Sequence, residues 1–158
     1  MGSAPAWQLP AAAKSSHAAA LVAARSYRPK TAEAPPRKLK MIRLRHRTDF
    51  LRAQRGRRVV KPSVTLETIA TPADYAAAGA ARIGFTATRK IGGAVERNRA
   101  KRRLRAAAAQ LLPLYGREGS DYVLVARPAT LTAPFAQILD DMTAALKSVR
   151  AAKTESRS

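Results

Sequence analysis

The feature that most constrains the fold is an alternating segment that runs into a glycine pair and then into a long helical pattern. Residues 82–88 alternate in side-chain character, as expected of a β-strand with two different faces. One set is Ile83, Phe85 and Ala87, and the smaller or more polar set is Gly84, Thr86 and Thr88. The glycines at 92–93 then break the strand and permit a turn. We expect a helix over residues 94–112, ending before Pro113 because proline has no backbone donor.

A first helix, further strands and a last helix accompany this unit. The segment RTDFLRAQRG predicts a short helix with Thr48 or Asp49 as its N-cap and Gly56 as its stop. The other predicted elements are strands over residues 64–70 and 121–127, a candidate short strand within RRVVK (57–61), and a last helix over 132–149. This order predicts an α+β fold in which helices pack on a small sheet as a two-layer sandwich.

Composition divides the chain into three parts. Residues 1–40 are rich in Ala, Ser, Pro and basic residues, so we expect a disordered basic N-terminal extension. An organelle transit peptide, or a true start at Met41, would produce the same pattern. The folded domain is expected over residues 41–150, and a disordered tail over residues 151–158.

The charge balance points to an anionic partner. The 158 residues include 30 Lys+Arg and 10 Asp+Glu, for a formal net charge of +20. Such an excess destabilises a compact chain through self-repulsion unless an anionic partner offsets it. Nucleic acid is the commonest partner of this kind. An anionic membrane is the alternative, but the basic helix has a single apolar stripe, and the fold uses it.

The predicted helix over residues 94–112 concentrates this charge. Its apolar positions form one stripe that can pack on the sheet, namely Ala100, Leu104, Ala107, Ala108 and Leu111. The remaining arc places three pairs one turn apart: Asn98 and Arg102, Arg99 and Arg103, and Lys101 and Arg105. Like charges at this spacing destabilise a helix by about 0.2–0.5 kcal/mol per pair, and cations near its N-terminus oppose the helix dipole. Phosphate groups would remove both penalties, so this arc predicts a nucleic-acid-binding surface.

The string RNRAKRRLR (97–105) is similar to the Arg-Asn-Arg signature of the bacterial ribonuclease P protein component family. The preceding RIGFTATRKIGGAV resembles the strand and turn of that family, Asp49-Phe50 resembles its first helix, and DYVLVARPA resembles its later strand. The resemblance extends in order from about Arg43 to Val149. It implies a ribosomal-protein-like α+β sandwich with a left-handed βαβ crossover, an exception to the usual handedness.

The same resemblance implies a division of labour within a ribonucleoprotein enzyme. The RNA subunit would perform the metal-dependent hydrolysis that matures the 5′ end of precursor tRNA, and it would require the Mg²⁺. The protein would bind no cofactor and carry no catalytic residue, with one protein per RNA, in the cytoplasm. It would bind the RNA subunit through the basic helix and its turn, by Arg89, Lys90, Arg97, Asn98, Arg99, Lys101, Arg102 and Arg105.

The resemblance also implies a cleft for the single-stranded 5′ leader, between the first helix and the open face of the sheet. The implied cleft residues are Phe50, Gly84, Thr86 and Thr88. Phe50 could stack on a base, since every base has a π-face, or it could serve only in core packing. The family often has a second aromatic residue one turn later, where this chain has Ala53 and Gln54. Leader stacking is therefore expected to be weaker here, or to involve another residue.

Other functional classes fit the sequence less well. A ribosomal protein or a general RNA-binding protein of the same fold would not be expected to carry the ordered string over residues 89–105. An autonomous metal-dependent nuclease would need a cluster of acidic or histidine ligands. The chain has no Cys, His17 and His46 lie outside any metal-ligand spacing, and Asp140 and Asp141 point apart on a helix. We therefore expect no metal site in the protein.

Overall fold

The structure is a computed structural model that describes residues 39–155, with only the backbone described for residues 153–155. Its strands are β1 (Lys40–Arg43), β2 (Arg57–Val60), β3 (Val64–Ala70), β4 (Ala80–Thr86) and β5 (Ser120–Ala126). Its helices are α2 (Arg47–Gln54), α3 (Ala94–Tyr115), α4 (Ala129–Thr132) and α5 (Phe135–Glu155), with short 3-10 turns η2 (Ala73–Tyr75) and η3 (Arg89–Ile91). The expectations for residues 1–38 and 156–158 lie outside the described residues.

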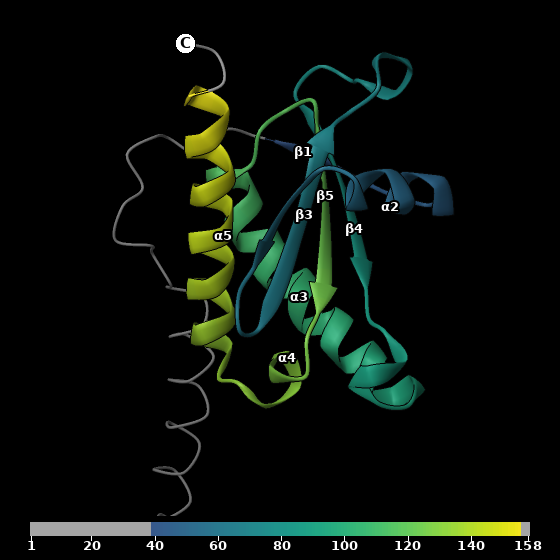
Figure 1. Ribbon diagram of the computed structural model, residues 1–158, viewed down its shortest axis with the longest axis vertical. Helices are drawn as coiled ribbons and strands as arrows, with labels where there is room; N and C mark the ends of the chain where they lie inside the picture. The colour runs from purple at the N-terminus through teal and green to yellow at the C-terminus, as the bar shows by residue number, and fades with distance from the viewer. Residues whose placement is uncertain (1–38, 156–158) are drawn as a thin grey trace, which may run out of the picture. The chain divides into compact units, whose positions relative to one another are not determined.

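The described residues form a five-stranded sheet in the order β1-β4-β5-β3-β2. β1 runs parallel to β4 and β4 runs parallel to β5, whereas β3 is antiparallel to both β5 and β2. In Figure 1, β4 and β5 both point downward, β5 lies to the left of β4, and α3 passes behind the sheet. The β4–α3–β5 crossover is therefore left-handed, as the sequence resemblance implies and against the usual rule.

The helices cover the two faces of the sheet unequally. α3 and α5 pack beside each other on one face, and the predicted apolar stripe of α3 is confirmed, since all of its residues are buried. α2 lies on the opposite face, where Phe50 packs against a small cluster formed by Leu44, Ala53 and Val123. This arrangement confirms the α+β prediction: the sheet and the α3–α5 layer form the two main layers, and the short α2 covers only part of the other face.

The predicted N-cap of the first helix is wrong. α2 begins at Arg47 with His46 as its cap residue, and His46 makes no side-chain capping bond. Thr48 and Asp49 therefore lie inside the first turn. Asp49 instead accepts a hydrogen bond from Arg82 on β4, because a buried carboxylate gains more from a charged partner than from a backbone amide.

The last turns of α3 continue past the expected stop. The helix includes Pro113 and ends at Tyr115. A proline inside a helix removes one backbone bond and disfavours the helix locally. Here Leu111, Leu112 and Tyr115 are all buried, so the packing of their side chains outweighs this local preference. The N–H of Gly116 then closes the helix on the carbonyl of Leu112 at 2.7 Å.

Other boundaries also differ from the expectations. β4 ends at Thr86, which leaves Thr88 outside the strand. α5 continues to Glu155, so residues 151–155 are helical where a disordered tail was expected; this segment is rich in good helix formers. The short strand in RRVVK is confirmed as β2. β1 was not predicted, because an edge strand of residues 40–43 with little burial has no clear alternation.

Candidate nucleic-acid interface

The residues expected to bind the RNA subunit lie together along η3 and the N-terminal half of α3. We call them the α3 basic face: Arg89, Lys90, Arg97, Asn98, Arg99, Lys101, Arg102 and Arg105. All are exposed except Arg97 and Lys101, which are half-buried. Within residues 39–155 none of them forms a salt bridge. Their charge is therefore available to an anionic partner.

The glycine pair sets the direction in which α3 leaves the sheet. Gly92 has φ +140°, in a region that strongly favours glycine. A Cβ at this position would lie 3.1 Å from the Cβ of Glu96, so a larger residue would push against the first turn of α3. Arg97 donates to the carbonyl of Gly92 at 3.4 Å. The turn and the start of the basic face are thus built as one unit.

Arg103 borders the same surface as Arg99, as helical spacing predicts, but the fold itself uses its guanidinium. Its guanidinium donates to the carbonyls of Thr130 at 2.5 Å, Leu131 at 2.8 Å and Ala133 at 2.5 Å. Burial, and then the positive charge of Arg99, lowers the pKa of Arg103. Carbonyls at the end of a short helix lack intrahelical donors, so Arg103 supplies hydrogen-bond donors to the free carbonyls at the end of α4. Its role is to fasten α4 to α3.

A shallow depression of about 910 Å³ runs along the basic face toward the start of α5. Arg99 and Arg102 line it together with the apolar side chains of Val95 and Phe135. Val95 is 77% exposed and Phe135 is half-buried. This surface combines cations with apolar contact area, which suits nucleotides as well as bare phosphates.

A groove of about 440 Å³ lies between α2 and the open face of the sheet, and we call it the α2 groove. α2 contributes Phe50, Leu51 and Gln54 to its lining, and the sheet contributes Thr86 and Val123. Two residues predicted for the leader cleft, Phe50 and Thr86, thus line one groove. Its aromatic wall suits a single-stranded segment, because bases stack on aromatic rings.

Gly84 lies beneath the ring of Phe50. A Cβ at residue 84 would stand 2.5 Å from Cε1 of Phe50, so the glycine makes room for the ring. Of the predicted cleft residues, Gly84 and Thr88 are not among those that line the groove, and Thr88 also lies outside the strand. It is exposed and precedes η3 as the N-cap residue, because β4 has already ended. Thr88 therefore lies between the groove and the basic face.

The groove also contains residues that sequence reasoning missed. Arg45 and Arg47 line it, and both are exposed. The run RLRHR (43–47), which ends shortly before Phe50, is the available signal, because cations near an aromatic are typical of single-strand binding. The expected second aromatic is replaced by Gln54 in the groove lining, while Ala53 is fully buried. The groove is therefore more polar at this end than the resemblance implies.

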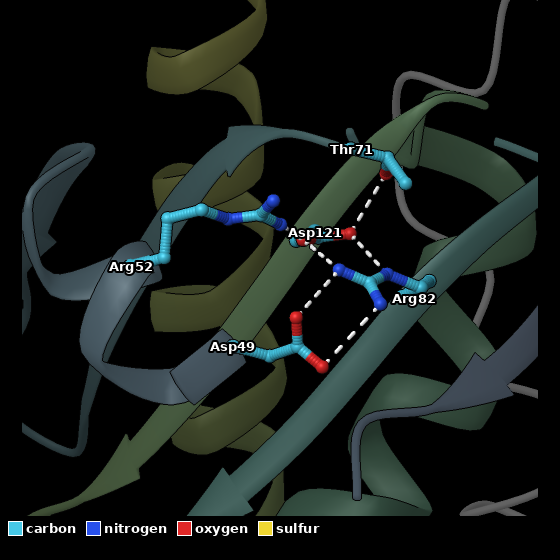
Figure 2. A network of polar contacts seen from close by, with 5 residues as sticks. All are labelled: Asp49, Arg52, Thr71, Arg82 and Asp121. Atoms are coloured by element: carbon cyan, nitrogen blue, oxygen red, sulfur yellow. Dashed lines mark hydrogen bonds and ion pairs between the residues drawn. The ribbon is translucent and has the colours of Figure 1, made fainter. Parts of the chain in front are cut away.

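A network of buried charges lies beside the groove (Figure 2). Arg82 donates through Nε to Oδ1 of Asp121 at 2.8 Å, and through Nη2 to Oδ2 of Asp121 at 2.6 Å and Oδ1 of Asp49 at 3.0 Å. Arg52 also pairs with Asp121, and the Thr71 hydroxyl donates to it at 2.7 Å. Burial tends to raise the pKa of Asp121. Hydrogen bonds from Arg82 and Thr71, with the nearby positive charges, outweigh burial and lower that pKa.

Within residues 39–155, no group of three or more His, Cys, Asp or Glu side chains is placed to hold a metal ion. The buried carboxylates of Asp49 and Asp121 are already engaged by arginines. In the same part of the chain, no helix combines the length and apolar character needed to cross a membrane.

Comparison with known proteins shows which family the chain resembles. A model of the family Ribonuclease P matches residues 39–150. The ribonuclease P protein component of Caulobacter vibrioides is 49% identical over 120 residues, which cover 76% of this chain and 78% of that protein. The same component of Ruegeria pomeroyi is 49% identical over 111 residues, covering 70% of this chain and 87% of that protein.

Solved structures give the same result for the fold. The RNase P protein from Thermotoga maritima is similar with a TM-score of 0.55 and 25% identity, covering 67% of this chain and 96% of that one. The Staphylococcus aureus RNase P protein has a TM-score of 0.55 at 23% identity, covering 68% and 94%, which supports the fold alone. The match over residues 39–150 includes both candidate surfaces. The chain therefore belongs to the ribonuclease P protein component family.

Proposed function

We propose that this chain binds the RNA subunit of ribonuclease P through the α3 basic face and holds the 5′ leader of precursor tRNA in the α2 groove. As a member of its family, the chain serves in the removal of that leader to produce the mature 5′ end of tRNA. The general RNA-binding and ribosomal alternatives lose their support, because the matched relatives share one specific name.

The observation that carries this proposal is the junction between the two surfaces. Thr86 lines the groove at the end of β4, and Arg89 begins the basic face only a few residues later. Phe85 lines the groove as well, and the guanidinium of Arg105 on α3 lies 5.8 Å from the centre of its ring. An RNA subunit on α3 and a leader in the groove would therefore lie next to each other, as one enzyme–substrate complex requires.

The chemistry in this proposal belongs to the RNA. Phosphodiester hydrolysis would be performed by the RNA subunit with its Mg²⁺, and the protein would supply positioning and positive charge. Asp49 and Asp121 fit this division, because both accept bonds from Arg82 and neither is among the residues that line the groove. A hard cation such as Mg²⁺ prefers carboxylate and water oxygens that are free to bind it.

We further propose a complex of one protein with one RNA, acting in the cytoplasm. The residues of the α3 basic face all lie on η3 and the adjoining α3, which suits one RNA partner.

The test is to purify the chain from its source together with its bound RNA and to sequence that RNA. A single long structured RNA, whose complex with the chain removes the leader from precursor tRNA, is the expected result. Recovery of ribosomal RNA alone would contradict the proposal.

A further inference from the structure

The helix that forms one wall of the groove has only a small apolar attachment to the sheet, in which Ala53 and Phe50 pack with Leu44 and Val123. Within α2 the buried residues are Asp49 and Ala53, and Leu51 is 46% exposed. Phe50 is half-buried, so its ring adds only partial burial. Since burial of apolar area is what normally holds a helix on a sheet, α2 depends strongly on polar contacts for its position.

Those contacts come from the buried network in Figure 2. Asp49 and Arg52 lie one turn apart on α2 and both point at the sheet. Asp49 is held by Arg82 on β4, and Arg52 is held by Asp121 on β5. Asp121 is fully buried, and Arg82 joins the two acids. α2 is therefore fastened to two neighbouring strands by charged hydrogen bonds, whose geometry is more specific than that of apolar contacts.

The network is directly connected to the groove. Asp49 precedes Phe50 in α2, and Arg82 lies two residues before Gly84 on the same face of β4. The Phe50 ring lies against Gly84, so a shift of α2 that breaks the pair between Asp49 and Arg82 also displaces the ring.

The geometry points to Arg82, Asp49 and Asp121 as positioning residues for leader recognition, which hold α2 where Phe50 and the sheet can both contact a single strand. This inference rests on the proposed role of the α2 groove. It goes further because it assigns the position of the α2 wall of the groove to a buried charge network. The three residues of that network do not line the groove.

The experiment uses the reconstituted complex of the full chain with its RNA subunit. It measures the affinity for precursor tRNA and for mature tRNA, and the ratio between them, well below the melting temperature. Asp49→Asn keeps the shape of the side chain but removes its charge. We expect precursor affinity to fall about tenfold, the equivalent of 1.4 kcal/mol. Affinities for mature tRNA and for the RNA subunit should stay unchanged. Asp121→Asn should act in the same direction.

A matched control is available on the other face of the sheet. Asp141 on α5 accepts bonds from the backbone N–H of Ser63 at 3.0 Å and from its hydroxyl at 2.7 Å. Asp141→Asn removes a carboxylate that also makes tertiary hydrogen bonds but does not line the groove. It should lower the melting temperature without changing the ratio of precursor to mature affinity. If Asp141→Asn lowered that ratio as much as Asp49→Asn does, the effect would reflect general stability alone, and the inference would be overturned.

A double-mutant cycle separates positioning from a direct or purely structural effect. If Asp49 acts through Phe50, then adding Asp49→Asn to Phe50→Ala should cause no further loss of precursor affinity. Additive losses would contradict the inference. If Phe50→Ala itself leaves the ratio unchanged, the groove assignment fails. If Phe50→Ala lowers the ratio and Asp49→Asn does not, the groove stands and the positioning role fails.

Discussion

The ring of Phe50 on α2 lies directly against Gly84 on β4, so close that a Cβ at residue 84 would stand 2.5 Å from Cε1 of the ring. Gly84→Ala should therefore push the ring away from the sheet. We expect a loss of stability of about 1–3 kcal/mol, the usual range for overpacking, together with weaker binding of precursor tRNA. Melting curves and precursor affinity of the reconstituted complex measure both effects. Unchanged values for both would show that the ring does not occupy this position.

Phe50 itself distinguishes leader stacking from core packing. If Phe50 stacks on a base of the leader, Phe50→Ala should weaken precursor tRNA binding by about 1–3 kcal/mol. Mature tRNA binding and assembly with the RNA subunit should stay nearly unchanged. If Phe50 serves only in core packing, Phe50→Ala should instead lower the stability of the fold by about 3–5 kcal/mol and change the affinities for both tRNAs alike. The measurement is the affinity of the complex for the two tRNAs beside a melting curve. Early melting with no preference between the tRNAs would rule out the groove assignment.

Arg99 and Arg103 provide a matched pair of substitutions on one helix. Arg99 is exposed on the basic face. Arg99→Ala should therefore reduce the slope of log RNA affinity against log salt concentration by about one unit and leave the melting temperature unchanged. Arg103 binds the carbonyls at the end of α4, so Arg103→Ala should keep the salt slope and lower stability by about 1.5–3 kcal/mol.

Filter binding over a salt series and thermal melting of both variants test this pair. If the two variants change the slope equally, the assignment of Arg103 to the fold is wrong.

The lowered pKa of Asp121 predicts that the stability of the fold decreases in acid. Its pKa is lowered in the folded chain from an ordinary value of 3.8, despite the opposing effect of burial. The ionised carboxylate therefore contributes stability that is present above 3.8 and is lost as the pH falls through the lowered pKa. Asp121→Asn should melt well below the wild-type chain at pH 7, and the two melting temperatures should converge in strong acid. A constant difference across the titration would exclude this linkage.

The raised pKa of Glu67 on β3 predicts the opposite dependence of stability on pH. Burial raises the pKa of Glu67 from 4.5, and the charge of Arg58 only partly offsets this effect. One carboxylate oxygen, Oε2, is buried without a hydrogen-bond partner in the described residues. The folded state therefore favours the protonated acid, and stability is lost as the pH rises above 4.5 through the raised pKa.

Glu67→Gln should accordingly melt at a higher temperature than the wild-type chain at pH 7, with the gain shrinking in acid. Melting temperatures measured over the acidic range check this, and a variant less stable at pH 7 would contradict it.

Periodicity and residue type were sufficient to predict the elements that carry the basic face. The stripe from Ala100 to Leu111 identifies which side of α3 packs on the sheet, and the glycines at 92–93 identify its start. The positions of Arg99 and Arg102 follow, because a regular helix turns by a constant angle per residue. Likewise, the alternation in β4 places Gly84 and Thr86 on the α2 side of the sheet, where Gly84 lies against Phe50 and Thr86 lines the groove.

The tertiary structure alone decided which charged residues the fold itself uses. Arg103 has the same local pattern as Arg99, and only the placement of α4 beside α3 turns it toward carbonyls. Asp49, Arg82 and Asp121 are separated by 33 and 39 residues, so no local pattern could pair them. The physical reason is that periodicity reports which side of an element faces the core, whereas buried ion pairs depend on which strands become neighbours. The left-handed β4–α3–β5 crossover brings β4 and β5 together beneath α2, and it thereby creates both the network and the groove next to it.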